Sequence, residues 1–127
     1  MGRWQQQITF IYVSNLANSH RFYVENLGFE LLVDQGDCRI YQTSSHGYLG
    51  LCERPELVDA PGSFLLTLVT PKVEEELERF AHAGVRIDTP AQVNERYAIT
   101  QGFVRDPDGY RIEIQRFHDA NWHTRPH

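Results

Sequence analysis

The stretch FVRDPDGYRIEIQRF, residues 103–117, predicts two short strands joined by a tight turn. Within the turn DPDG (106–109), the proline ring fixes φ and the glycine can adopt a positive φ. Because side chains alternate between the two faces of a strand, Ile112 and Ile114 share one face and Glu113 lies on the other. A carboxylate on a sheet face needs hydrogen-bonding partners or a ligand, so Glu113 is a candidate functional residue.

The residues before this stretch predict a strand, a helix and a further strand. FLLTLVT (64–70) is an apolar run that suits a strand. Thr70 can cap the following helix, Pro71 suits its first position, and Gly84 ends it. VRIDT (85–89) then follows as a strand. From residue 64 onward the order is therefore strand, helix and three strands, or βαβββ.

The first half of the chain repeats this order. ITFIYVSNL (8–16) begins with the β-branched and aromatic residues typical of a strand. Ser14 or Asn15 can cap the next helix, and Gly28 ends it. FELLVD, CRIYQT and YLGLCE predict three more strands, at residues 29–34, 38–43 and 48–53. We therefore expect one α+β domain over residues 1–127, with module one at about 7–54, a linker at about 55–62, module two at about 63–118 and a polar tail at 119–127.

Composition and charge exclude several classes of function. Of the 127 residues, 41% are hydrophobic and 23% are charged, which is typical of a globular protein. The formal net charge of −5 argues against nucleic acid as a partner, and no apolar run approaches the roughly 20 residues that span a membrane. Cys38 and Cys52 could pair, but two free thiols are the simpler interpretation, and we expect a cytoplasmic protein.

Two stretches carry a resemblance to a known family: SNLANSHRFYVENLGF (14–29) and FVRDPDGYRIEIQRF. Together with the doubled βαβββ order, they resemble the vicinal oxygen chelate superfamily, which includes glyoxalase I, bleomycin-resistance proteins, extradiol dioxygenases and methylmalonyl-CoA epimerase. The resemblance covers about residues 7–118. It implies that the two modules form a curved mixed sheet, a cup with the helices on its convex side, often completed in a homodimer. A small molecule would bind in the concave face of this cup.

The same resemblance implies where a metal ion would bind. Catalytic members of the family hold a divalent ion with one residue from each of four strands, usually histidine or glutamate. The corresponding positions here are Ile8, Gly50, Leu65 (within one residue) and Glu113. Only Glu113 has a side chain that can bind a divalent ion. We therefore predict no cofactor, unless ligands outside the family pattern, such as His46, are recruited to hold a divalent metal.

Strand alternation predicts which side chains line the concave face. The set is apolar and aromatic with a few polar groups, as in many small-molecule sites. A filled core is the alternative to an open pocket. The predicted lining consists of Ile8, Phe10, Tyr12, Tyr48, Gly50, Cys52, Leu65, Thr67, Val69, Arg111, Glu113 and Gln115, with Arg39 and Tyr41 able to reach the rim.

Three roles for Glu113 remain open at this stage. It can pair with an arginine such as Arg111 or Arg39, bind a ligand amine or hydroxyl, or act as a catalytic base. The functions that follow are a metal-free binding protein for a small aromatic or cationic compound, a lyase, isomerase or dioxygenase, and a protein-interaction module with a closed cup. The tail at residues 118–127 has three histidines, but their spacing does not match a zinc-binding pair.

Overall fold

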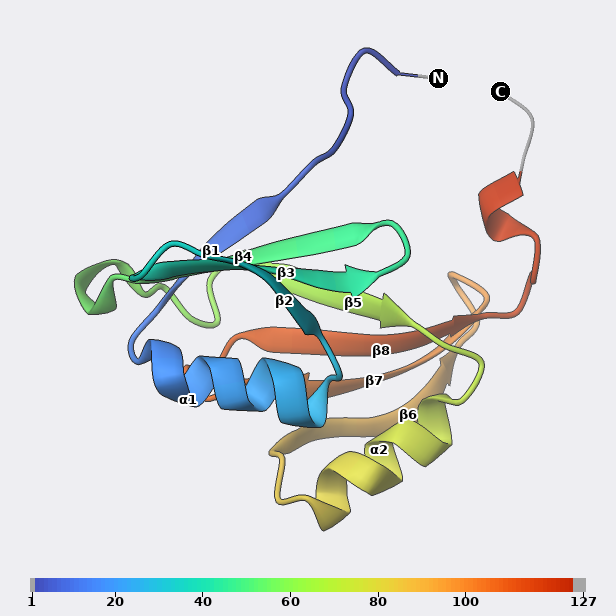
Figure 1. The fold of residues 1–127 in the computed structure, drawn as a ribbon. Coiled ribbons are helices and arrows are strands. Elements are labelled where there is room, and N and C mark those ends of the chain that lie inside the picture. The colour runs from blue at the N-terminus through green and yellow to red at the C-terminus, as the bar shows by residue number, and fades with distance from the viewer. Residues whose placement is uncertain (1, 125–127) are drawn as a thin grey trace. The chain divides into compact units, whose positions relative to one another are not determined.

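A computed structural model describes residues 2–124 of the chain. The chain divides into two compact units, Met1–Asp59 and Ala60–His127. Each unit contains one four-stranded sheet and one helix that follows its first strand (Figure 1). The predicted α+β fold with two βαβββ modules is thereby confirmed.

The first unit has the sheet order β1-β4-β3-β2, in which β1 runs parallel to β4 and the other pairs are antiparallel. Helix α1 continues into a π-helical turn at Phe22–Asn26, and Gly28 follows with a positive φ of 76°, as its predicted role at the helix end requires. The elements are β1 (Thr9–Val13), α1 (Leu16–Arg21), β2 (Glu30–Asp34), β3 (Cys38–Ser44), β4 (Gly47–Glu53) and a 3₁₀ turn (Pro55–Leu57).

The second unit repeats this arrangement with the sheet order β5-β8-β7-β6, and β5 runs parallel to β8. The DPDG turn connects β7 to β8, and Gly109 has the expected positive φ, at 96°. The elements are β5 (Leu65–Val69), α2 (Val73–His82), β6 (Ile87–Asn94), β7 (Ile99–Arg105), β8 (Arg111–Phe117) and a 3₁₀ turn (Trp122–Thr124).

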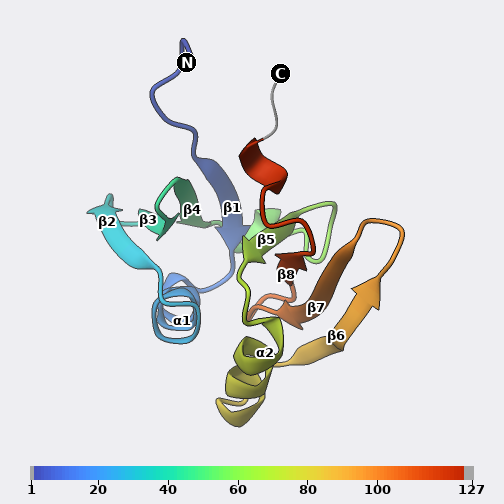
Figure 2. The same ribbon diagram turned by 90° about the vertical axis from the view of Figure 1, so that its right-hand side faces the viewer.

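In each unit the helix covers one face of its own sheet and leaves the other face without a helix (Figure 2). The buried side chains of the first unit include Ile11, Leu49 and Leu51, which the strand register places on one face. Val104, Ile112 and Ile114 form the corresponding layer in the second unit, where α2 buries Val73, Leu77 and Phe80. We call the sheet face opposite the helix the open face of each unit.

Side-chain hydrogen bonds lie at the start of both helices, and in α1 they cap the helix. Asn15 is the cap of α1, because its side-chain oxygen accepts a hydrogen bond of 2.9 Å from the Asn18 N–H. At the start of α2, Arg116 of β8 donates two hydrogen bonds to Glu74, and these lower the pKa of Glu74 to about 2. Within residues 2–124, no helix is long and apolar enough to cross a membrane.

Two predicted boundaries are wrong. Helix α2 begins at Val73 with Lys72 as its cap residue, so Thr70 and Pro71 lie before the helix. Strand β6 continues past residue 89 to Asn94 and includes Pro90. This is possible because β6 is an edge strand and its register to β7 shifts between Thr89 and Gln92, where the proline needs no ladder hydrogen bond.

The expectation of two free thiols is also wrong, because Cys38 and Cys52 form a disulfide. Strands β3 and β4 are antiparallel, and their register places these two residues directly opposite each other. Side chains directly opposite on neighbouring strands lie on the same face and are close enough to bond. The bridge therefore ties β3 to β4, an inner strand of the first unit's sheet.

Candidate functional site

The open face of the second unit gathers most of the polar side chains predicted to line a pocket. In the register of β5 with β8, Leu65 lies opposite Arg111, Thr67 opposite Glu113, and Val69 opposite Gln115. Strand β7 adds Phe103 opposite Glu113 and Gln101 opposite Gln115. The predicted residues of β5 and β8 therefore do share one face of the sheet. Their role in binding stays a prediction.

Glu113 is buried at the centre of this face, with 5% of its surface exposed. Its Oε1 accepts a hydrogen bond of 2.7 Å from the Thr67 hydroxyl. Its Oε2 accepts one from the Gln115 amide at 3.0 Å and another from the Gln101 amide. Gln101 in turn accepts a hydrogen bond of 2.9 Å from Asn94. The carboxylate is thus held by uncharged donors on three strands.

Neither of the arginines considered as partners pairs with Glu113. The guanidinium of Arg111 lies over the Phe103 ring, 4.6 Å from its centre, and Arg39 lies 3.7 Å from Asp34 within the first unit. Among residues 2–124, no cation forms an ion pair with Glu113 and no carboxylate forms one with Arg111. The hypothesis of an arginine bridge is therefore wrong, and a negative and a positive group stand unpaired on one face.

The open face of the first unit is mainly aromatic. Phe10 and Tyr12 lie opposite Gly50 and Cys52, and all four share one face, whereas Ile8 lies just before β1. Phe10 is 46% exposed, and its ring rests on Gly50 so closely that a Cβ there would lie 2.2 Å from the Phe10 Cδ1. Gly50 therefore leaves no free space, because the Phe10 ring occupies it.

The positions that hold a metal ion in the family do not fit one here. Isoleucine, glycine and leucine offer no ligand atom at Ile8, Gly50 and Leu65, and the Phe10 ring covers Gly50. Within residues 2–124, no three His, Cys, Asp or Glu side chains gather in a way that could hold a metal ion. Function without a metal ion remains a prediction.

Substitution of Gly50 by alanine should lower the free energy of unfolding by about 1–3 kcal/mol, because the new methyl group must displace the Phe10 ring. Urea unfolding of Gly50→Ala, Phe10→Ala and the double variant measures this effect. In the double variant the Gly50→Ala cost should largely disappear, since the ring is gone. An equal cost of Gly50→Ala with and without Phe10 would contradict the contact.

Arg39 and Tyr41 do not lie on the open face. They are opposite Leu51 and Leu49, and this register places them on the face that α1 covers. Tyr41 is fully buried, its hydroxyl lies 2.7 Å from the His20 Nδ1, and burial raises its pKa. The prediction that these residues reach the rim is wrong, because the register of β3 on β4 places them on the face that α1 covers.

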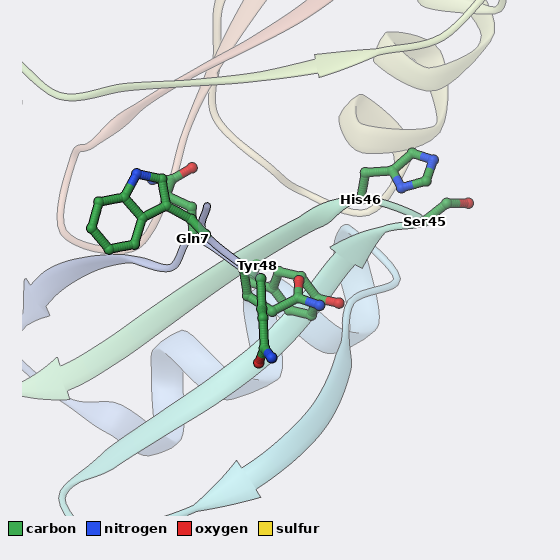
Figure 3. A pocket seen from close by; sticks show the side chains of 7 residues that line it. Gln7, Ser45, His46 and Tyr48 are labelled. Atoms are coloured by element: carbon green, nitrogen blue, oxygen red, sulfur yellow. The ribbon is translucent and has the colours of Figure 1, made fainter. Parts of the chain in front are cut away.

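A hollow of about 400 Å³ lies at one end of the first unit, and sequence reasoning missed it. Of its lining, only Tyr48 was predicted, and His46 had been considered as a metal ligand. Figure 3 shows Ser45 and His46 at the end of the β3–β4 hairpin, with Gln7 and Tyr48 set back from them. The run WQQQ (4–7), an aromatic residue followed by three amides, was the sequence feature that could have indicated this hollow. The lining consists of Trp4, Gln5, Gln6, Gln7, Ser45, His46 and Tyr48.

Comparisons with known proteins agree with this fold. Three of the similar solved structures, each with a TM-score above 0.7, illustrate this. A glyoxalase-related enzyme from Fulvimarina pelagi is 26% identical (89% of this chain, 88% of that chain, TM-score 0.72). TioX from Micromonospora sp. ML1 is 21% identical (89% and 98%, TM-score 0.72). A superfamily member from Sphaerobacter thermophilus is 19% identical (89% and 97%, TM-score 0.74).

No curated protein sequence matches the chain significantly. A family model described as Glyoxalase/Bleomycin resistance protein/Dioxygenase superfamily matches residues 5–114, which is most of the chain. The match covers the first βαβββ module and the second as far as β8, where it ends one residue after Glu113. The chain therefore belongs to the glyoxalase, bleomycin-resistance protein and dioxygenase superfamily.

Proposed function

We propose that this protein binds a small organic acid on the open face of the second unit, without the metal ion of its catalytic relatives. The observation that carries the proposal is the pair of unpaired charges on β8. Arg111 and Glu113 are two residues apart on the same face, which places them roughly 7 Å apart along the strand. A ligand with complementary groups would satisfy both.

Arg111 is suited to bind an anionic group. Its guanidinium is held over the Phe103 ring and has no carboxylate partner within the described residues. A guanidinium presents a rigid set of N–H donors that matches the two oxygens of a carboxylate. A purely cationic compound, one of the ligands considered from the sequence, would be repelled by Arg111.

Glu113 is suited to accept a hydrogen bond from the same ligand. A carboxylate has about four lone-pair positions, and Thr67, Gln101 and Gln115 occupy three of them. A ligand hydroxyl or amino group can donate to the fourth. Leu65 and Val69, both exposed on this face, can contact an apolar part of the ligand. An aromatic hydroxy acid or amino acid has all three features.

The experiment is isothermal titration calorimetry with aromatic hydroxy acids and amino acids, together with metal analysis of the purified protein. Glu113→Gln removes the charge but keeps the shape, and should weaken binding by about tenfold or more. Arg111→Met should weaken it similarly. Arg96→Met is the matched control, since Arg96 also lies over an aromatic ring, Tyr97, but in the β6–β7 connection.

Unchanged affinity in both Glu113→Gln and Arg111→Met would contradict this site, and stoichiometric zinc, nickel, manganese or iron would contradict metal-free binding. Catalysis is the second candidate function, because the similar protein from Fulvimarina pelagi is described as an enzyme. In that case NMR spectra of the bound compound would show its conversion, and Glu113→Gln would abolish this conversion if Glu113 is the base.

A further inference from the structure

We propose that the hollow of the first unit is a second binding site, for a neutral saccharide. This second site goes beyond the proposed function, since the hollow lies in the other unit. It uses none of the residues of the site around Arg111 and Glu113, which we call the β8 site. Its volume of about 400 Å³ falls within the range of small-molecule sites. Two segments form it: residues 4–7, which precede β1, and the hairpin residues Ser45, His46 and Tyr48.

The charge of the lining favours a neutral ligand. None of the seven lining side chains belongs to Asp, Glu, Lys or Arg, and His46 is the only histidine among them. Phosphate groups in proteins are usually held by arginine, lysine or helix N-termini. None of the seven lining residues supplies such a group, and the neighbouring Arg3 guanidinium is engaged over the Trp4 ring, so the lining favours a neutral ligand over a nucleotide or a sugar phosphate.

The aromatic side chains offer flat apolar surfaces. Trp4 is 76% exposed, which leaves most of a large apolar ring in contact with water. The guanidinium of Arg3 lies over this ring, 5.2 Å from its centre. Tyr48 adds a second ring with a polar hydroxyl. The C–H face of a pyranose can cover such a ring and remove apolar surface from water on both sides.

The amide side chains match the hydroxyl groups of a sugar. Each glutamine has both a donor and an acceptor, as does each sugar hydroxyl. The Gln7 amide nitrogen donates to the Thr9 hydroxyl at 2.9 Å, and this bond orients the side chain and leaves its oxygen free to accept. Gln5, Gln6 and the Ser45 hydroxyl complete a set of uncharged groups that can bind several hydroxyls at once.

The two tryptophans of the chain provide a direct test. Trp4 lines the hollow, whereas Trp122 stacks on Phe117, 4.2 Å between ring centres, in the second unit. In Trp122→Phe, Trp4 is the only tryptophan and its fluorescence reports on the hollow alone. Titration with glucose, maltose, cellobiose and N-acetylglucosamine should give a saturable change for at least one of them, with a dissociation constant of about 1 mM.

Saturation-transfer NMR with the same saccharide then compares matched variants. Trp4→Ala should weaken binding by at least about tenfold, Gln6→Ala by several-fold, and Trp122→Ala should leave it unchanged. Glu113→Gln should also leave it unchanged, so this site and the β8 site fail or succeed separately. No saturable binding of any of the four saccharides, binding that survives Trp4→Ala, or binding of adenosine in their place would overturn the proposal.

Discussion

Cys38→Ser should lower the free energy of unfolding by about 3 kcal/mol, because the disulfide to Cys52 closes a loop of 14 residues in the unfolded chain. Without the bridge, the unfolded state gains conformational freedom that the folded state does not. The folded state also loses the covalent tie between β3 and β4, and β4 pairs with both β1 and β3. Urea unfolding with and without a reductant measures the effect.

Three comparisons separate the bridge from the effect of the substitution itself. Wild type in reductant should approach the stability of Cys38→Ser. Cys38→Ser should not respond to reductant, and Cys38→Ser/Cys52→Ser should resemble the single variant. If wild type and Cys38→Ser unfold at the same urea concentration without reductant, the two cysteines do not form the bridge in solution.

Glu113→Leu should also lower the free energy of unfolding by about 3 kcal/mol. Leucine has a similar size but accepts no hydrogen bond, so the donors of Thr67, Gln101 and Gln115 lose their partner. A buried donor left without a partner costs about 1–3 kcal/mol, and the Thr67 hydroxyl can turn to reduce the total. Thermal and urea unfolding measure the loss.

Glu113→Gln is the informative comparison, because it should change stability by less than about 1 kcal/mol. Its amide oxygen can face Gln101 and Gln115, and its amide nitrogen can donate to the Thr67 hydroxyl. Glu56, exposed in the 3₁₀ turn Pro55–Leu57, is the control site for both changes. If Glu113→Leu is as stable as Glu113→Gln, the carboxylate is not held by these donors.

Local sequence patterns predicted the fold, because the same order of strands and helix occurs in both halves of the chain. Apolar runs of strand length, the helix cap at Asn15 and the glycines at 28 and 109 each depend on neighbouring residues only. The shared face of Thr67, Glu113 and Gln115 followed from alternation, since β5 and β8 pair without a register shift. Gln101 could also have been predicted as a partner of Glu113, because the short turn between β7 and β8 fixes the register of these two strands.

Other features depend on contacts that no local pattern contains. The disulfide needs the register of β3 on β4, and so does the placement of Tyr41 beneath α1. The position of Arg111 over Phe103 depends on which of several rotamers packs best on the neighbouring strand. The hollow around Trp4 depends on how the residues before β1 lie beside the hairpin, far along the chain.

The Phe10 ring that rests on Gly50 also affects how this protein can evolve. Gly50→Glu alone would restore one ligand position of the family but would collide with the ring. Loss of the Phe10 ring alone would leave Gly50 uncovered and gain no ligand. Each single step is therefore less favourable than the present pair, and Ile8 and Leu65 would still offer no ligand atom. A metal site at the positions that the family uses would thus need several changes in this chain, at Phe10 as well as at the ligand positions themselves.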